Sequence, residues 1–158
     1  MTDTLTPQQR SAHMAKIGAG LRKNRLERTV HGILKGAHIR HRMYPTVRPS
    51  FDVELRTPGG SVYVAVDGCF WHACPDHYRR PKTRPRFWER HVEEAERLRM
   101  ERRRAFAGPW IRIWEHDVHA GRDLVVGMVK LAVAAVEADP AVHGELTFAD
   151  LLAAWKEE

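Results

Sequence analysis

The stretch Ser61-Val62-Tyr63-Val64-Ala65-Val66-Asp67-Gly68-Cys69-Phe70-Trp71-His72-Ala73-Cys74-Pro75-Asp76-His77 changes character partway along its length. Residues 61–67 are apolar and rich in β-branched side chains, which predicts a strand. Residues 69–77 then bring together thiols, imidazoles and large aromatic rings. Thiolates and imidazoles are the ligands that Zn²⁺ prefers, and exposed aromatic rings stack on nucleic-acid bases. The stretch therefore predicts a strand that ends in a loop suited to metal and base contact.

The composition indicates a single globular domain with a polyanionic partner. The chain has 158 residues, of which 43% are hydrophobic, and it carries a formal net charge of +6. That length is enough to bury a core, and arginine, the main source of the charge, binds phosphate with a planar fork of donors. The alternative is a basic surface with no such partner. No apolar run approaches the ~20 residues of a membrane span, and residues 1–5 lack the features of a signal peptide, so we expect a cytoplasmic protein.

Periodicity and turn residues predict an α/β fold with a small mixed sheet flanked by helices. We expect a basic N-terminal arm over residues 1–23, a main domain over residues 24–138 and a C-terminal extension over residues 139–158. We also expect a monomer. The predicted elements are a helix from Asn24, strands over 51–55, 61–67 and 110–114, a helix over 85–107 with Trp88, Val92, Ala95 and Leu98 on its inner face, a helix from Gly121 and a short helix over 147–155.

Both cysteines of the chain lie close together, which favours a metal site over a disulfide in a protein without an export signal. Cys69 and Cys74 are followed by His77, and His116 at the end of the third predicted strand is the fourth candidate ligand. Asp76 and His119 are the substitutes for His116. Four protein ligands make a closed, structural zinc site. The alternative is a pair of buried thiols with histidines facing solvent.

Asp52 and His72 are the candidates for hydrolytic chemistry. A carboxylate on a short strand suits Mg²⁺, which takes one or two carboxylates together with substrate phosphate oxygens. An imidazole titrates near neutral pH and can therefore deprotonate a water molecule. The alternatives are an edge-strand Asp52 and a surface His72 that both face water. Glu27 is a weaker candidate, because a capping box with Asn24 already explains it.

Aromatic and basic side chains form a third candidate group for DNA contact. Three large aromatic rings are positioned to unstack base pairs at a cost of a few kcal/mol per step, and the neighbouring cations suit phosphates. The alternatives are that Trp88 belongs to the core and that the cations simply face solvent. The candidates are Phe70, Trp71 and Trp88, the loop residues Lys82, Arg84 and Arg86, and Arg10 and Lys16 of the N-terminal arm.

Several of these segments together resemble the very-short-patch-repair (Vsr) DNA mismatch endonucleases. The resemblance covers about residues 10–120, and the core Asp67-Gly68-Cys69-Phe70-Trp71-His72 is its most specific part. The segments that carry it are Phe51-Asp52-Val53, Val62 to His72, Pro81 to Trp88, Trp110 to Glu115, Arg10-Ser11-Ala12-His13-Met14 and Glu27.

The resemblance implies a restriction-endonuclease-like (PD-(D/E)XK-type) three-layer sandwich with a structural zinc site. The implied activity is Mg²⁺-dependent, strand-specific nicking of double-stranded DNA at T·G mismatches, near the nucleoid and with possible repair-protein partners. The implied roles are Mg²⁺ binding by Asp52 and the main-chain carbonyl of Val66, general-base catalysis by His72, support by Glu27, a wedge of Phe70, Trp71 and Trp88, and zinc binding by Cys69, Cys74, His77 and His116.

The long helix departs from the pattern of the family that it resembles. An Asp of the family's catalytic network corresponds to a place near Arg99, and an Asn one turn earlier is replaced by Ala95. Glu96 and Glu101 are the candidate replacements for that Asp. Two alternatives follow from this departure. One is a DNA-binding protein of the same fold with lost or altered cleavage, and the other is a related nuclease that acts on other DNA.

Overall fold

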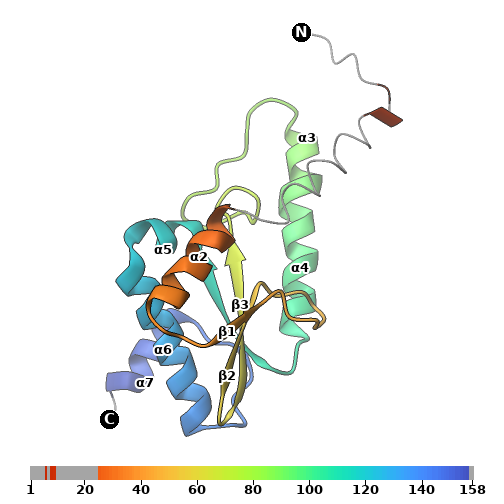
Figure 1. The fold of residues 1–158 in the computed structure, drawn as a ribbon. Helices are drawn as coiled ribbons and strands as arrows, with labels where there is room; N and C mark the ends of the chain where they lie inside the picture. The colour runs from red at the N-terminus through yellow and green to blue at the C-terminus, as the bar shows by residue number, and fades with distance from the viewer. Residues whose placement is uncertain (1–5, 7, 10–24, 157–158) are drawn as a thin grey trace.

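The computed structural model describes residue 6, residues 8–9 and residues 25–156 (Figure 1). Most of the predicted N-terminal arm, including Arg10 and Lys16, lies outside the described residues. Among the described helices, none is both long and apolar enough to pass through a bilayer.

A mixed sheet forms the middle of the molecule, as the sequence predicts, but it has five strands where the sequence predicts three. Its strand order is β1-β2-β3-β4-β5, with antiparallel pairing between β1, β2 and β3 and parallel pairing from β3 to β4 and from β4 to β5. A parallel pair needs a long connection, and the helices of residues 85–104 provide it between β3 and β4. The strands are β1 His41–Met43, β2 Val53–Thr57, β3 Gly60–Asp67, β4 Pro109–Trp114 and β5 Gly144–Glu145.

The turn between β2 and β3 depends on two glycines. Gly60 pairs with Thr57 and has a φ of +141°, a region that side-chain-bearing residues rarely adopt. A Cβ atom on Gly59 would lie 2.5 Å from the carbonyl oxygen of Val136, so only glycine lets the turn pack against the helix of residues 122–138. The turn sets the register of β3, and hence the face to which each of its side chains points.

Helices cover both faces of the sheet and give three layers (Figure 1). On one face lie α2 Arg25–Gly36, α5 Glu115–Ala120, α6 Arg122–Ala138 and α7 Phe148–Lys156. On the other face a continuous helical stretch consists of α3 Pro85–Trp88, a π-helical segment Glu89–Glu94 and α4 Ala95–Arg104. Within the predicted C-terminal extension, β5 joins the sheet and Leu151 of α7 is buried in the core.

The first face is apolar. Alternate residues of β3 point to it, because successive side chains of a strand lie on opposite faces. Their neighbours on β4 and on the buried sides of α2 and α6 complete a single cluster. Its fully buried members include Val30, Leu34, Val62, Val64, Ile113, Val125 and Val129.

The second face combines a small aromatic cluster with buried charges. Phe51, Ala65 and Trp110 form the buried aromatic cluster below the helical stretch. The predicted inner face of that stretch is wrong in part. Val92 is fully buried, but Leu98 is 39% exposed, while Glu96 and Arg103 are buried. The physical reason is that these two charged side chains pair with opposite charges on β3 and β4, which hydrophobic periodicity does not reveal.

Candidate active site and metal centre

Asp67, the last residue of β3, is the centre of the buried charges. Arg103 of α4 donates to both of its carboxylate oxygens, at 2.6 and 3.3 Å, and Arg112 of β4 donates to one of them at 2.6 Å. Burial opposes ionisation of Asp67, but Arg103, His72 and Arg112 together outweigh it and hold the pKa of the carboxyl below its ordinary value. Asp67 is therefore an anion at neutral pH, held on the side of the sheet that faces α4.

His72 lies between two carboxylates. Its Nδ1 is 3.1 Å from an Asp67 oxygen and 3.1 Å from a Glu96 oxygen. Burial also opposes ionisation of Glu96, but hydrogen bonds from His72 and Arg112 hold the pKa of that carboxyl below its ordinary value. A proton on Nδ1 satisfies the two carboxylates and leaves Nε2 as the basic nitrogen of the ring. Asp67, His72 and Glu96 also offer ligand atoms within 4.8 Å of one another, close enough to hold a metal ion.

The acid of the helix at this site is Glu96 and not Glu101. Arg99 donates to a Glu96 oxygen at 2.5 Å, and the same guanidinium nitrogen lies 3.2 Å from Nδ1 of His72. Glu101 instead pairs with Arg97 on the exposed side of α4. The resemblance places an acid near Arg99. In the structure, Arg99 instead contacts Glu96, the acid one turn before it.

Asp52 lies just before β2, beside the end of β3. Its carboxylate accepts a hydrogen bond of 2.8 Å from the main-chain N–H of Val66. Burial, with the nearby carboxylates of Glu27 and Asp67, raises the pKa of Asp52 to about 6, although the hydrogen bond from Val66 lowers it. Asp52 does not belong to the Asp67–His72–Glu96 group. It contacts Val66, the residue next to Asp67, so the carboxylates of Asp52 and Asp67 both lie near the same end of β3.

Glu27 of α2 lies near Asp52, and Tyr44 contacts both residues. The Tyr44 hydroxyl donates to Glu27 at 2.8 Å, and the Tyr44 main-chain N–H donates to the Asp52 carbonyl at 2.8 Å. Burial, the hydrogen bond to Glu27 and the two carboxylates raise the pKa of Tyr44 to about 12. No sequence motif singles out Tyr44, because its place depends on the pairing of β1 with β2.

Four candidate zinc ligands lie together beside this site. Cys69, Cys74, His77 and His116 place one ligand atom each within 4.8 Å of one another. The Sγ atom of Cys69 is 3.3 Å from Nδ1 of His116, and that of Cys74 is 3.6 Å from Nδ1 of both histidines. Sulfur and nitrogen ligands of one tetrahedral zinc ion are about 3.5 Å apart, given the usual bond lengths. The donor set and its spacing therefore fit zinc.

The two substitutes for His116 do not enter this group. Asp76 and His119 are both exposed, and neither contributes to the group of four. Burial, together with the Cys74 thiol beside it, raises the pKa of the Cys69 thiol to about 11. Both effects disfavour a thiolate at neutral pH unless a cation lies between the sulfurs, because a bound metal stabilises the deprotonated ligand.

The loop of residues 68–78 connects the metal centre to His72. Main-chain hydrogen bonds of 2.9 to 3.4 Å fold it into consecutive turns, and the Cys69 N–H also donates to the Glu115 carboxylate at 3.0 Å. His72 lies between the two cysteines of this loop. His72 and three of the four candidate metal ligands therefore belong to one loop.

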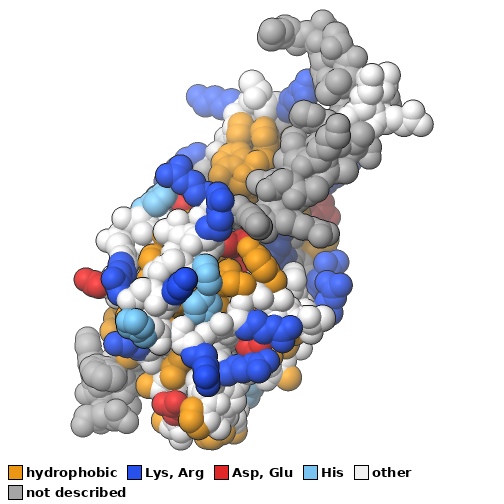
Figure 2. Space-filling view, in the orientation of Figure 1, with side chains coloured by type: hydrophobic (Ala, Val, Ile, Leu, Met, Phe, Trp, Pro, Cys, Tyr) orange, Lys and Arg blue, Asp and Glu red, His pale blue; other side chains and the backbone are white. Residues whose placement is uncertain are grey.

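The three aromatic candidates form one cluster with the additional ring of Phe87. The ring centroid of Phe70 lies 5.2 Å from that of Trp71 and 5.4 Å from that of Trp88. The ring centroids of Phe87 and Trp88 are 5.0 Å apart. Trp71 is 62% exposed and Phe87 is 45% exposed, whereas Trp88 is half-buried and donates to the Thr83 carbonyl. Figure 2 shows hydrophobic side chains on the surface in the region of α3, with Lys and Arg side chains around them.

The basic candidates of the neighbouring loop are on the surface. Lys82, Arg84 and Arg86 are all exposed, so their charges are accessible from solvent. In the same loop, Arg80 is paired with Glu93 of the helix and is less available to an anion.

One curated protein is similar to part of this sequence. No known family model matches the chain. A segment is 41% identical to the type II nicking enzyme V.NaeI of Lentzea aerocolonigenes, in an alignment of 59 residues that covers 35% of this chain. The chain thus matches about a third of its relative, 36% of that protein's length.

Proposed function

We propose that this protein is a metal-dependent DNA endonuclease that nicks one strand of a duplex. The observation that carries the proposal is the convergence of His72, two buried carboxylates and Asp52 at the end of β3. The partial similarity to a nicking enzyme supports the same reaction class. The net charge of +6 and the exposed aromatic cluster suit a DNA substrate.

Within this mechanism, His72 is the general base. Asp67 and Glu96 hold its Nδ1 by hydrogen bonds, so Nε2 accepts the proton of the attacking water. The two anions also stabilise the imidazolium that forms, as a carboxylate does for a catalytic histidine. Arg103 and Arg112 keep Asp67 ionised, and Arg99 brings a positive charge to the edge of the site.

Asp52 and the main-chain carbonyl of Val66 are the proposed Mg²⁺ ligands, with Glu27 supporting the metal-bound water shell. The raised pKa of Asp52, about 6, reflects a buried carboxylate near other anions, and a divalent cation relieves that repulsion. Mg²⁺ in such a site neutralises the charge of the scissile phosphate.

The finer proposal is a substrate with a T·G mismatch, as in very short patch repair. A mismatch weakens base stacking, which lowers the cost of inserting the rings of Phe70, Trp71 and Trp88. The second candidate is a nicking enzyme that acts on other DNA, because the relative is named only as a type II nicking enzyme.

A nicking assay with T·G, U·G and fully matched duplexes in Mg²⁺ tests both candidates. We expect nicking of one strand of the T·G duplex, and equal cutting of the matched duplex would select the second candidate. Asp52→Ala should lower nicking at least about a thousandfold while DNA binding persists. Asp76→Ala, which removes an exposed carboxylate, is the matched control. Binding without nicking in any divalent metal would overturn the endonuclease proposal.

Zinc in the four-residue group is a separate proposal with its own test. We expect one zinc equivalent per chain in metal analysis of the purified protein. Cys74→Ala and His116→Ala should each lose that metal, and chelation should unfold the protein, because structural zinc contributes folding free energy. His119→Ala should retain the metal. A folded, zinc-free wild-type protein would contradict the proposal.

A further inference from the structure

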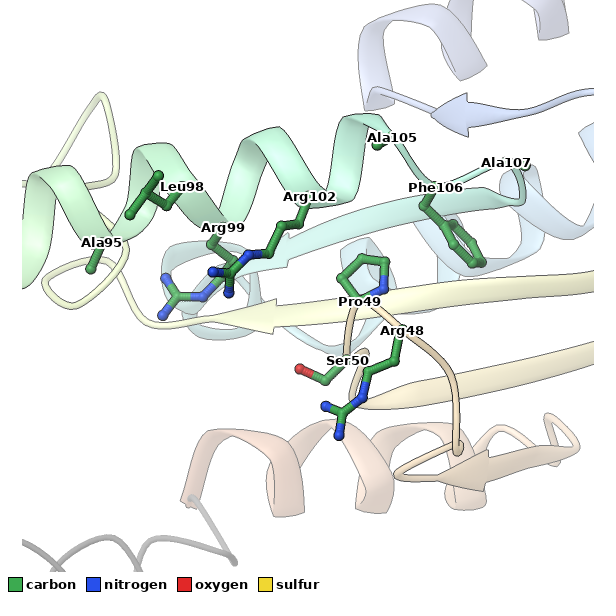
Figure 3. Close-up of a pocket in the computed structure, with 10 residues that line it drawn as sticks. All are labelled: Arg48, Pro49, Ser50, Ala95, Leu98, Arg99, Arg102, Ala105, Phe106 and Ala107. Carbon is green, nitrogen blue, oxygen red and sulfur yellow. The ribbon is translucent and has the colours of Figure 1, made fainter.

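A surface groove lies beside the active site, between α4 and the segment that precedes β2. Its volume is about 850 Å³. Figure 3 shows Arg99 and Arg102 pointing from α4 toward the loop that carries Arg48, Pro49 and Ser50. The remaining lining residues are small or apolar, namely Ala95, Leu98, Ala105, Phe106 and Ala107.

The charge of this groove has one sign. Three arginines line it and no carboxylate does. Arg48 and Arg102 are exposed, and neither forms an ion pair or hydrogen bond within the part of the chain that the structure describes. Two unpaired guanidinium groups that face one groove favour an anion with several oxygens.

The other large surface hollows differ from this groove. The hollow along the outer side of the helical stretch balances three arginines with Glu89, Glu93 and Glu94. A third hollow holds Arg40, Arg42 and Arg56, but Arg56 pairs with Glu54 and this hollow lies at the turn between β2 and β3. That turn is at the opposite end of β3 from Asp67.

The groove is continuous with the catalytic group through Arg99. Its guanidinium lines the groove and also contacts Glu96 and His72. Arg102 lies one helical turn beyond Arg99 on α4, so the lining of the groove extends from the catalytic group along that helix. The apolar lining of Leu98 and Phe106 suits the deoxyribose rings between phosphates.

We propose that this groove binds the sugar–phosphate backbone of the DNA strand next to the cleaved phosphodiester, with Arg48 and Arg102 as the phosphate-binding residues. The inference deepens the proposed endonuclease function and rests on it for the identity of the ligand. The groove thereby fixes the position of the strand along the active site.

The salt dependence of DNA binding tests this proposal. The probe is a short fluorescent duplex with one T·G mismatch, titrated without divalent cations at several KCl concentrations. Each of Arg48→Gln and Arg102→Gln should weaken binding about tenfold and reduce the slope of log K against log[KCl] by about 0.9. Arg102→Lys should keep the slope, because it retains the charge. The matched control is Arg104→Gln, which removes an exposed arginine of the same helix outside the groove.

Neutral methylphosphonate linkages identify the contacted phosphates. One linkage beside the cleavage site should weaken wild-type binding about tenfold and have no further effect on Arg102→Gln. If both groove variants behave like Arg104→Gln while the wild type nicks DNA, the groove proposal is overturned and the endonuclease proposal stands. If the slopes change as expected but no metal supports nicking, the endonuclease proposal fails instead. A wild-type protein without affinity for the duplex overturns both.

Discussion

The two faces of the sheet are stabilised by different physical interactions. The face under α2 and α6 is a continuous apolar cluster, with Val30, Leu34 and Val129 fully buried. The face under α4 buries Asp67, Glu96 and Arg103 next to a small aromatic cluster. Both faces use alternate residues of the same strands, so the register of β3 assigns one set of its side chains to the core and the other to the site.

The difference between the faces separates stability from chemistry. Apolar burial stabilises the fold in proportion to the area removed from water and without dependence on pH. A buried ion pair adds little net stability against an apolar replacement, but removal of one partner is costly. The charged face is therefore the part of the molecule where pH, substitutions and ligands act together.

The largest expected effect is that of Arg103→Ala. This change leaves the buried Asp67 carboxylate without one of its two arginine partners, and the free energy of unfolding should fall by about 3–5 kcal/mol. Urea denaturation at pH 7 measures this loss of stability.

The contribution of Asp67 to stability depends on pH. The pKa of Asp67 is lowered in the folded protein, so this contribution is present above the ordinary carboxyl pKa and is lost as the pH falls toward and below that value. Arg102→Ala, an exposed neighbour, should change stability by less than about 0.5 kcal/mol. A loss below about 1 kcal/mol for Arg103→Ala would show that Arg112 alone suffices.

Leu34→Ala on the apolar face should destabilise the protein by about 3 kcal/mol, because it leaves a cavity under α2. The same urea experiment at pH 5.5 and pH 8 should give the same loss, in contrast to Arg103→Ala. Nicking per folded molecule should not change. A strong pH dependence of this loss, or selective loss of nicking, would break the division between the faces.

Asp52→Asn should act in the opposite direction, with a gain of about 3 kcal/mol in stability at pH 7 without divalent cations. The pKa of Asp52 is about 6 in the folded protein, above its ordinary value of 3.8. The folded protein thus retains a proton that the unfolded chain releases, and Asp52 lowers stability as the pH rises from about 4 to about 6. An asparagine oxygen still accepts the hydrogen bond from Val66.

Denaturation at pH 4.5 and pH 7 measures this effect. The gain should be small at pH 4.5 and should shrink in Mg²⁺, which stabilises only the wild type. Asp76→Asn is the exposed control. An equal gain at both values of pH would exclude titration of Asp52 as its cause.

The strands β2, β3 and β4 and the helices α2 and α6 were predictable because each carries a repeating apolar pattern. The short strands β1 and β5 were not, since three or two residues show no period and owe their conformation to pairing with β2 and β4. The burial of Glu96 was also not predictable, because it depends on the ion pair with Arg112, a partner sixteen residues away in sequence.

The candidate site follows the same division. Residues that lie close in sequence, such as Cys69, Cys74 and His77, were grouped from their spacing alone, although their zinc ligation remains a proposal. His116 was also the first choice for the fourth ligand, and the geometry of β4 and α5 places it, and not the substitutes Asp76 and His119, with the other three residues. Tyr44, Arg99 and Arg103 have no motif of their own, and only the packing of β1 and α4 brings them to the site.

The two neighbours of β3 bear on how the chain folds. β2 joins it through a tight turn, whereas β4 pairs with it only after the connection of residues 68–108. Closing a short loop costs less entropy than closing a long one, so the β2–β3 hairpin is expected to form early and the β3–β4 pair late. A partly folded chain would then hold three of the four candidate zinc ligands before the charged face exists, and metal bound at that stage would favour the nucleus from which the remaining sheet assembles.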